Sequence, residues 1–183
     1  MTAYPAAPLL LCLDVQPVFL AAITDSQRFH WRCSFALEAA TGLGVPVVFT
    51  EQVPDKLGHT AADLLALCRE PEVLPKTAFS PFAEKKLAVH LKAKGHRQLL
   101  ICGLETPICV YQTAIDALKA GYKVTVLADC VGARRPADAA AVLAQLAHDG
   151  CRVLPAETVF YALLHEAAHP YFRDYTKLVK KYG

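Results

Sequence analysis

Cys109 is the residue of this sequence whose surroundings best suit it for chemistry. The apolar run 99–102 stops at Gly103, and after Pro107 the apolar residues recur at helical spacing, so the pattern predicts a strand that passes into a helix through a tight turn. Cys109 falls in the first turn of that helix, where free backbone N–H groups and the helix dipole favour an anion. A thiol is easily ionised at such a place. We therefore predict that Cys109 is a nucleophile with a lowered pKa.

The other six cysteines are interpreted as structural. Free cysteine is among the most buried residue types and packs like a small hydrophobe. The six lie in apolar or helical stretches or just after a strand; they are Cys12, Cys33, Cys68, Cys102, Cys130 and Cys151. An odd total of seven, without short spacings such as C-x-x-C, favours a reducing compartment over a disulfide framework or a structural zinc site.

Asp14 and Lys76 could supply the groups that a thiol needs. A thiol has an ordinary pKa of about 8.5, so a carboxylate that accepts its proton and an ammonium that stabilises the thiolate both help it to react. Asp14 follows the apolar run 9–13, and Lys76 lies in the extended piece 74–80. We assign Asp14 as base, Lys76 as electrostatic partner and Cys109 as nucleophile, with turn N–H groups up to and including that of Cys109 as oxyanion hole. This chemistry is attack on the carbon of an amide or related C–N group, through a thioester-like intermediate that water hydrolyses.

Each of these residues also has a structural interpretation. Asp14 could cap the next loop or pair with a lysine, and Lys76 could extend its ammonium to solvent. His59 could contact a ligand or substrate, but a histidine in a loop is usually just solvated. Asp129, which follows the apolar run 124–128, is interpreted as structural.

The elements that must position these residues alternate along the chain. Strands or extended pieces are expected at 9–13, 45–49, 74–80, 99–102, 124–128 and 151–154. Helices are expected at 26–40, 60–70, 81–94, 107–120, 137–146, 157–166 and 170–181. This alternation predicts an α/β fold, a three-layer α/β/α sandwich whose mostly parallel sheet has five or six strands. Ligands of such sheets bind at the carboxyl ends of the strands, where Asp14, Lys76, Cys109 and Asp129 are all expected.

Length and composition predict a single domain over residues 1–183. The chain is 54% hydrophobic and 20% charged, so it can bury a core without disulfides. A formal net charge of +2, with basic residues scattered among acidic ones, gives no footprint for nucleic acid. The N-terminal segment 1–16 has too short an apolar run for a signal peptide or an anchor, and no stretch reaches about 18 apolar residues. We expect a soluble, intracellular and cytoplasmic protein, with an organelle left open, whose partners include neither nucleic acid nor membrane.

The motifs around the three candidate residues resemble those of the isochorismatase-like cysteine hydrolases. LLLCLDVQ contains Asp14, LPKTAFS contains Lys76 and CGLETPICVYQTAIDAL contains Cys109, in the order of that family. VVFTEQVPDKLGHT and the C-terminal AAHPYFRDYTKLVK are similar to the isochorismatase domain-containing proteins. The resemblance implies an α/β/α sandwich with six parallel strands, a triad of these three residues and a homo-oligomer. It also implies a non-proline cis peptide just before Glu105, whose N–H would join that of Cys109 in the oxyanion hole.

The region after the second expected strand departs from one branch of this family. Nicotinamidases hold a metal with an Asp-x-His pair and a further His, whereas residues 51–59 here read EQVPDKLGH, with one Asp and one His at another spacing. We therefore expect no catalytic metal and no cofactor, and nicotinamide and pyrazinamide become poor candidate substrates. Isochorismatase itself does not use the cysteine position as a nucleophile, so Cys109 argues against isochorismate. The residues expected to line the substrate pocket are Glu51, Gln52, His59 and Phe19.

The sequence therefore predicts a metal-independent cysteine hydrolase that cleaves a C–N bond of a small, amide-like, non-peptide molecule. A catalytically inactive binding or scaffold protein that retains the triad as a ligand pocket is the alternative. A nucleic-acid enzyme is a third hypothesis, which the lack of a basic stripe with interleaved aromatic residues disfavours.

Overall fold

A computed structural model of the chain describes residues 7–183. The expectation that the segment 1–16 is neither a signal peptide nor an anchor therefore lies, for residues 1–6, outside the described residues. Across residues 7–183, no helix combines the length and the apolar character needed to cross a membrane.

Six strands of the described chain form one sheet in the order β3-β2-β1-β4-β5-β6, and every pairing is parallel. The strands are β1 (Leu9–Leu13), β2 (Val47–Gln52), β3 (Glu72–Lys76), β4 (Gln98–Leu104), β5 (Lys123–Gly132) and β6 (Arg152–Leu154). The chain builds outward from β1 to β3 and then returns to place β4 on the other side of β1. The strand order thus reverses between β1 and β4, and ligands of open parallel sheets bind at the carboxyl ends of strands at such a reversal.

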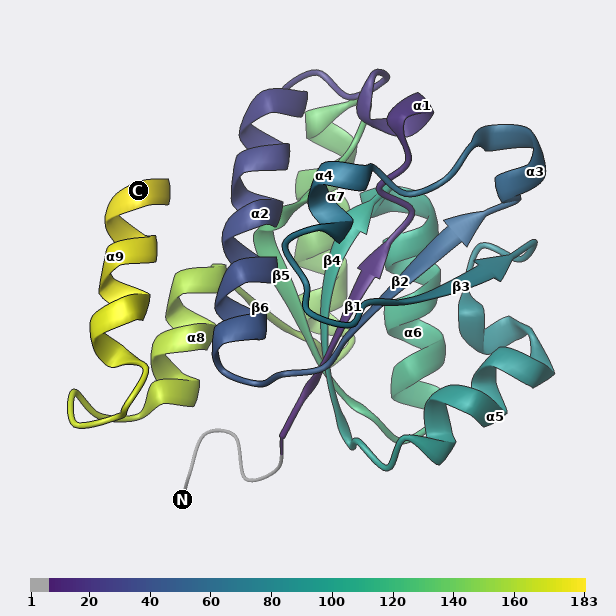
Figure 1. The fold of residues 1–183 in the computed structure, drawn as a ribbon. Helices are drawn as coiled ribbons and strands as arrows, with labels where there is room; N and C mark the ends of the chain where they lie inside the picture. Colours follow the sequence, from purple (N-terminus) through teal and green to yellow (C-terminus); the bar gives the residue numbers. More distant parts are fainter. Residues whose placement is uncertain (1–6) are drawn as a thin grey trace.

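Helices cover both faces of the sheet (Figure 1). The α-helices are α1 (Pro17–Leu20), α2 (Ser26–Gly42), α3 (Pro54–Leu57), α4 (Ala62–Leu65), α5 (Lys85–Ala93), α6 (Tyr111–Lys119), α7 (Pro136–His148), α8 (Ala156–Leu164) and α9 (Phe172–Tyr182). A 3₁₀ turn, η1 (Pro81–Ala83), precedes α5, and a π-helical turn, η2 (Thr106–Val110), precedes α6. Helices α2, α8 and α9 pack on one face, and α5, α6 and α7 pack on the other. The predicted three-layer α/β/α sandwich with six strands is confirmed.

The core is divided by the sheet into two apolar layers. Successive residues of β1 point to opposite faces, so Leu10 and Cys12 pack towards α2 while Leu9, Leu11 and Leu13 pack towards α6. All five side chains are fully buried. Burial on both faces explains why the central strand is a continuous apolar run rather than an alternating one.

Four local expectations were wrong. The helix expected over 60–70 is only the short α4, and α3 was not expected. The helix expected from Pro81 is divided, because Glu84 is extended and its carboxylate accepts hydrogen bonds from the backbone N–H groups of Thr77 and Ala78, at 2.6 and 2.8 Å. Asp129 lies inside β5, which continues to Gly132. The second strand also runs further than expected, so it ends with Gln52.

Candidate active site

The three residues of the predicted triad meet at the carboxyl end of the sheet. Asp14 directly follows β1, Lys76 is the last residue of β3, and Cys109 lies in η2, two residues before α6. Strand β2 separates β1 from β3, so the long Lys76 side chain must reach past it to the end of β1. The topology thus gathers a carboxylate, an ammonium and a thiol from segments that are far apart in the sequence.

The contacts among the three residues are direct. Lys76 Nζ donates a hydrogen bond to Asp14 Oδ2 at 2.7 Å and lies 3.8 Å from Cys109 Sγ. Asp14, Lys76 and Cys109 are only 1%, 2% and 7% exposed, so these charges interact with little screening by solvent.

Neighbouring residues hold the acid and the amine in place. Thr50 Oγ1 donates to Asp14 Oδ1 at 2.7 Å, which leaves the other carboxylate oxygen to Lys76. Lys76 Nζ also donates to Gln52 Oε1 at 2.5 Å and to the carbonyl of Ala78 at 3.3 Å. The three N–H groups of the ammonium thus have three acceptors, namely Asp14, Gln52 and Ala78, and these contacts fix the position of Lys76 Nζ.

Gly103 allows the ends of β1 and β4 to come together. Its φ is +111°, and a Cβ on this residue would lie 2.1 Å from the carbonyl oxygen of Leu13. Only glycine fits this position. Because Asp14 follows Leu13 and η2 follows β4, this close approach brings the carboxylate near the thiol.

The expected lowering of the Cys109 pKa is wrong. Burial and the negative charge of Asp14 raise the pKa of the Cys109 thiol to about 12, although Lys76 and a hydrogen bond from the Glu105 backbone act in the opposite direction. Burial also raises the pKa of Asp14, with Lys76 opposing the shift. The sequence indicated the helix terminus, the Lys76 ammonium and Asp14 as a base, but neither the burial of the thiol nor the repulsion between the Asp14 charge and a thiolate. A pKa of about 12 favours the protonated thiol at neutral pH. The role of Asp14 as the base that accepts this proton stays a prediction.

The turn that carries Cys109 is built around Glu105. The peptide bond between Leu104 and Glu105 is cis. The carbonyl of Glu105 accepts hydrogen bonds from the N–H groups of Ile108 and Val110, at 3.0 and 3.2 Å, which closes the π-helical turn. Such turns often occur at functional sites. The Glu105 backbone lies close enough to Cys109 to lower the pKa of its thiol.

Of the residues expected to bind substrate, Gln52 contacts the triad through Lys76, and several polar atoms of the others are engaged elsewhere in the chain. Gln52 Nε2 donates to the carbonyl of Thr77 at 2.7 Å, and its Oε1 accepts from Lys76. Glu51 accepts from the Thr60 N–H at 2.6 Å and pairs with His59 Nδ1 at 3.1 Å. These contacts define supporting roles, and a role in substrate binding stays a prediction for Glu51, Gln52 and His59. It also stays a prediction for Phe19, which is half-buried in α1.

The donors beside the triad do not fit the metal site of the nicotinamidase branch. They are one carboxylate, Glu51, and one imidazole, His59, and the carboxylate is already engaged by the Thr60 N–H. Catalytic zinc sites generally use three protein ligands. The residues present therefore do not supply the ligands of that metal.

Two other groups that carry chemistry lie away from the triad. Asp129 accepts hydrogen bonds from Arg32 Nε and Nη2, at 2.9 and 2.7 Å, and from the Ala156 N–H at 2.7 Å, so it joins β5 to α2 and α8 rather than the candidate site. Cys12, Cys33 and Cys102 form a second group, with sulfur atoms within 4.8 Å of one another. All three are fully buried in the apolar layer beneath α2, which agrees with their interpretation as core residues.

Sequence reasoning missed Thr50, Gln16 and Arg134. Thr50 pairs with Leu13 in the parallel register of β1 and β2, so the register places its hydroxyl beside Asp14. Gln16 accepts from the Gln52 N–H at 2.8 Å and thereby ties the segment after β1 to the end of β2. The pattern of buried polar residues at strand ends is the signal that could have found the first two. Arg134 is exposed and lies in a loop, so its contacts with Glu105 are visible only in three dimensions.

The fold and the site together define an α/β/α protein with a buried cysteine, aspartate and lysine at the carboxyl end of its parallel sheet. The sequence matches the Isochorismatase domain over residues 8–158, and the chain belongs to this family. This confirms the resemblance that the motifs around the triad indicated.

The relatives and solved structures agree with this assignment. The chain is 32% identical over 176 residues to Isochorismatase domain-containing protein 1 of Danio rerio; the match covers 96% of this chain and 62% of that relative. The structure of MAR1 ribonuclease from Caenorhabditis elegans superposes with a TM-score of 0.90 at 28% identity, covering 98% of this chain and 93% of the other. The YcaC gene product of Escherichia coli, described as an octameric hydrolase of unknown specificity, superposes with a TM-score of 0.83 at 19% identity over 100% and 98% of the two chains. At that identity the last likeness concerns the fold alone.

Proposed function

We propose that this chain is a metal-independent cysteine hydrolase that cleaves the C–N bond of a small amide-like molecule. The observation that carries the proposal is the buried arrangement in which Lys76 Nζ contacts both Asp14 Oδ2, at 2.7 Å, and Cys109 Sγ, at 3.8 Å. Membership of the isochorismatase family supports a hydrolytic role. The substrate class and the assignment of individual roles are our proposal.

The first half of the reaction forms a thioester. The Cys109 sulfur attacks the amide carbon while its proton passes to Asp14, which suits a thiol whose pKa is held at about 12 and which needs a base at the moment of attack. The oxyanion that forms accepts hydrogen bonds from the N–H groups of Glu105 and Cys109. Collapse breaks the C–N bond, and the leaving nitrogen takes the proton from Asp14 and departs as ammonia or an amine.

The second half hydrolyses the thioester. Asp14 accepts a proton from a water molecule, whose oxygen attacks the acyl carbon, and the same oxyanion hole stabilises the new tetrahedral intermediate. Collapse breaks the C–S bond, and the proton on Asp14 returns to the Cys109 sulfur. Lys76 favours the ionised form of Asp14 between the steps, because its ammonium opposes the rise in carboxyl pKa that burial causes.

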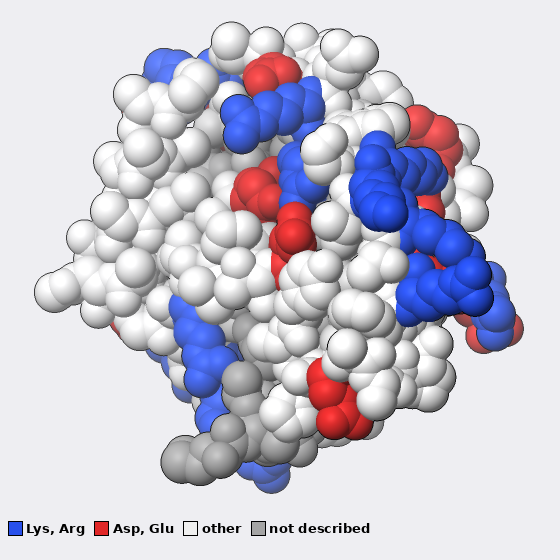
Figure 2. All heavy atoms as spheres, turned by 90° about the vertical axis from the view of Figure 1, so that its left-hand side faces the viewer, with Lys and Arg blue, Asp and Glu red and all other residues white. Residues whose placement is uncertain are grey.

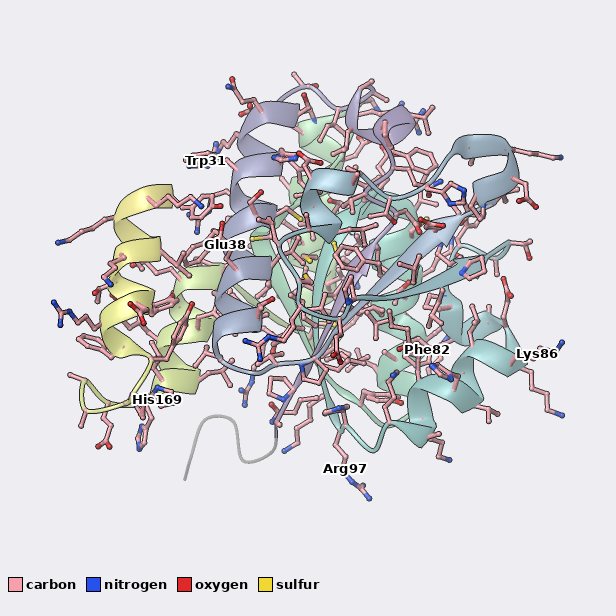
Figure 3. All side chains as sticks on the ribbon, in the orientation of Figure 1. Trp31, Glu38, Phe82, Lys86, Arg97 and His169 are labelled. Atoms are coloured by element: carbon pink, nitrogen blue, oxygen red, sulfur yellow. The ribbon has the colours of Figure 1, made fainter. Side chains whose placement is uncertain are left out.

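The burial of the triad favours a small substrate. Cys109 is 7% exposed and Asp14 is 1% exposed, so the reacting carbonyl must enter a narrow site. We propose that Glu51, Gln52, His59 and Phe19 line the path to it. A homo-oligomer is also part of the proposal: Trp31 is 46% exposed on α2, where its ring contacts that of Tyr182 of α9 at a tilt of 59°, with centroids 4.7 Å apart. Figure 3 shows Trp31 and Glu38 on the outer side of α2, facing α9.

RNA cleavage is a second candidate, suggested by the ribonuclease name of the C. elegans structure. The charge distribution does not favour it. On the face that carries α8 and α9, several basic side chains lie beside acidic ones (Figure 2), and Lys177 and Lys181 pair with Asp174 and Glu38. Binding to a polyanion of this kind is strongly salt-dependent. RNA binding with a steep salt dependence, or RNA cleavage lost in Cys109→Ala, would favour this candidate.

The test of the proposed function is ammonia release from a panel of small carboxamides in the presence of a metal chelator. Wild type is compared with Cys109→Ala and with Cys151→Ala, which removes another buried thiol away from the triad. We expect release by wild type and Cys151→Ala and none by Cys109→Ala. Release that chelation abolishes would contradict metal independence. Absence of ammonia release by the wild type from every carboxamide in the panel would favour the alternative of a binding or scaffold protein.

A further inference from the structure

Glu105 is held from three sides. Its carbonyl closes η2 through the N–H groups of Ile108 and Val110, which flank Cys109 in the chain, and its backbone lowers the pKa of the Cys109 thiol. Its carboxylate contacts Arg134 in the loop after β5. A change at the carboxylate can therefore alter the direction of the backbone N–H of the same residue.

Arg134 donates hydrogen bonds to this carboxylate from both its side chain and its backbone. Arg134 Nε lies 3.0 Å from Glu105 Oε1 and 3.1 Å from Oε2, and the Arg134 N–H donates to Oε1 at 3.1 Å. The loop is itself fixed, because Thr24 Oγ1 donates to the Arg134 carbonyl at 3.1 Å. One residue further along, the buried Thr106 donates through Oγ1 to the carbonyl of Gly132 at 2.9 Å. Residues 132–134 thus hold 105–106 through both side chains.

An irregularity in β5 places this loop beside the site. Ile101 of β4 pairs with Val126, but Gly103 pairs with Val131. A step of two residues along β4 therefore corresponds to a step of five residues along β5. Extra residues of this kind redirect a strand and often occur next to active sites. The redirected end of β5 runs alongside the end of β4 and brings Arg134 to Glu105.

We propose that Arg134 is a positioning residue for the oxyanion hole, because its grip on the Glu105 carboxylate keeps the Glu105 N–H directed at the place where the oxyanion forms. This inference rests on the proposed function. We name the contact the Arg134–Glu105 clamp. It assigns a role in catalysis to an exposed loop residue that does not itself touch the substrate.

The exposure of the clamp separates this role from a purely structural one. The Arg134 side chain is 56% exposed and the Glu105 side chain is 15% exposed, so solvent screens the pair in part and its contribution to folding stability is small. The next residue offers a matched control: Arg135 is also exposed and pairs with Asp138, three residues along its own helix. Replacing either arginine removes one exposed ion pair, but only Arg134→Ala removes a contact with Glu105.

The first experiment measures turnover of an amide that the wild type hydrolyses. We expect Arg134→Ala to lower kcat by about ten- to hundredfold with little change in KM, as for a displaced oxyanion donor, while Arg135→Ala stays near wild type. Arg134→Lys is expected to recover part of the loss, because an ammonium can contact one carboxylate oxygen. The two alanine variants are expected to unfold at similar temperatures. A wild-type kcat for Arg134→Ala, or an equal loss in Arg135→Ala, would overturn the proposal.

The second experiment needs no substrate and so separates failure of the clamp from failure of the proposed function. It measures the rate of alkylation of Cys109 by iodoacetamide against pH, with the modified peptide identified by mass spectrometry. The Glu105 N–H stabilises the thiolate, so its displacement is expected to move the profile to higher pH in Arg134→Ala and not in Arg135→Ala. Identical profiles in the two variants would contradict the clamp even if amide turnover were established. A displaced profile would support the clamp even if no amide were hydrolysed.

Discussion

Lys76 Nζ lies 2.7 Å from Asp14 Oδ2 in an ion pair whose two side chains are 0% and 1% exposed. Moving two charges out of water costs several kcal/mol each, so such a pair is weak evidence for a gain in stability. Its value here is positional, since the same ammonium also contacts the Cys109 sulfur. Each charge nevertheless depends on the other, because removal of one leaves its partner buried and uncompensated.

Replacement of one member of this pair is therefore expected to destabilise the fold more than replacement of both. Lys76→Met should lower the free energy of unfolding by about 3 kcal/mol or more, and adding Asp14→Asn should restore part of that loss. Urea denaturation of the two single variants and the double variant measures the coupling. Additive losses would show that the two charges do not compensate each other. All three variants are expected to lose amide turnover.

The reactivity of Cys109 is expected to differ from that of a surface thiol. Because burial and Asp14 raise its pKa to about 12, the thiolate fraction at pH 8 is small and continues to rise well above pH 9. Iodoacetamide should therefore alkylate Cys109 slowly at pH 8, with a rate that still increases at alkaline pH. Asp14→Asn removes the negative charge that disfavours the thiolate and should move the profile to lower pH. A profile that levels off near pH 8 in the wild type would contradict the structure.

The same pKa makes folding stability depend on alkaline pH. The unfolded thiol ionises near its ordinary pKa of about 8.5, whereas the folded thiol ionises near 12, so the folded state binds more protons between these values. Stability is then expected to fall as the pH rises through this window. Cys109→Ala should lose less stability than wild type between pH 8 and pH 10 in urea titrations. Parallel losses in the two proteins would show that Cys109 does not contribute.

Gly103 provides a test of the close approach of β1 and β4. Gly103→Ala would place a Cβ 2.1 Å from the Leu13 carbonyl at a φ of +111°, so we expect a loss of about 3 kcal/mol in the free energy of unfolding. Gly95→Ala is the control, since Gly95 also has a positive φ, +76°, but has nothing within 4 Å of the added atom. Its loss should be smaller because it carries backbone strain without the steric clash. Equal losses in the two variants would mean that the close contact with Leu13 adds nothing to the cost of the substitution at Gly103.

The sequence predicted the parts of this protein that follow from periodicity and from strand ends. The apolar run 9–13 predicted a central parallel strand, and its end predicted the location of Asp14. The sequence could not predict the pKa of Cys109, because this pKa depends on burial and on the Asp14 carboxylate, which comes near the thiol only when the sheet assembles. The irregular register of β5 could not be predicted either, because no local sequence pattern marks the place where five residues of β5 lie opposite two residues of β4. For this reason Arg134 was missed, and Asp129 was placed at a strand end that lies further along the chain.

In the proposed mechanism, Cys109 carries the acyl group during amide hydrolysis. The most direct measurement is mass spectrometry of the protein, quenched in acid during turnover of the best carboxamide in the panel, with Cys109→Ala measured in parallel. We predict a mass increase equal to the acyl group on the wild-type peptide that contains Cys109, discharged by hydroxylamine, and neither adduct nor ammonia release in Cys109→Ala. Ammonia release by Cys109→Ala at the wild-type rate would show that Cys109 does not carry the acyl group.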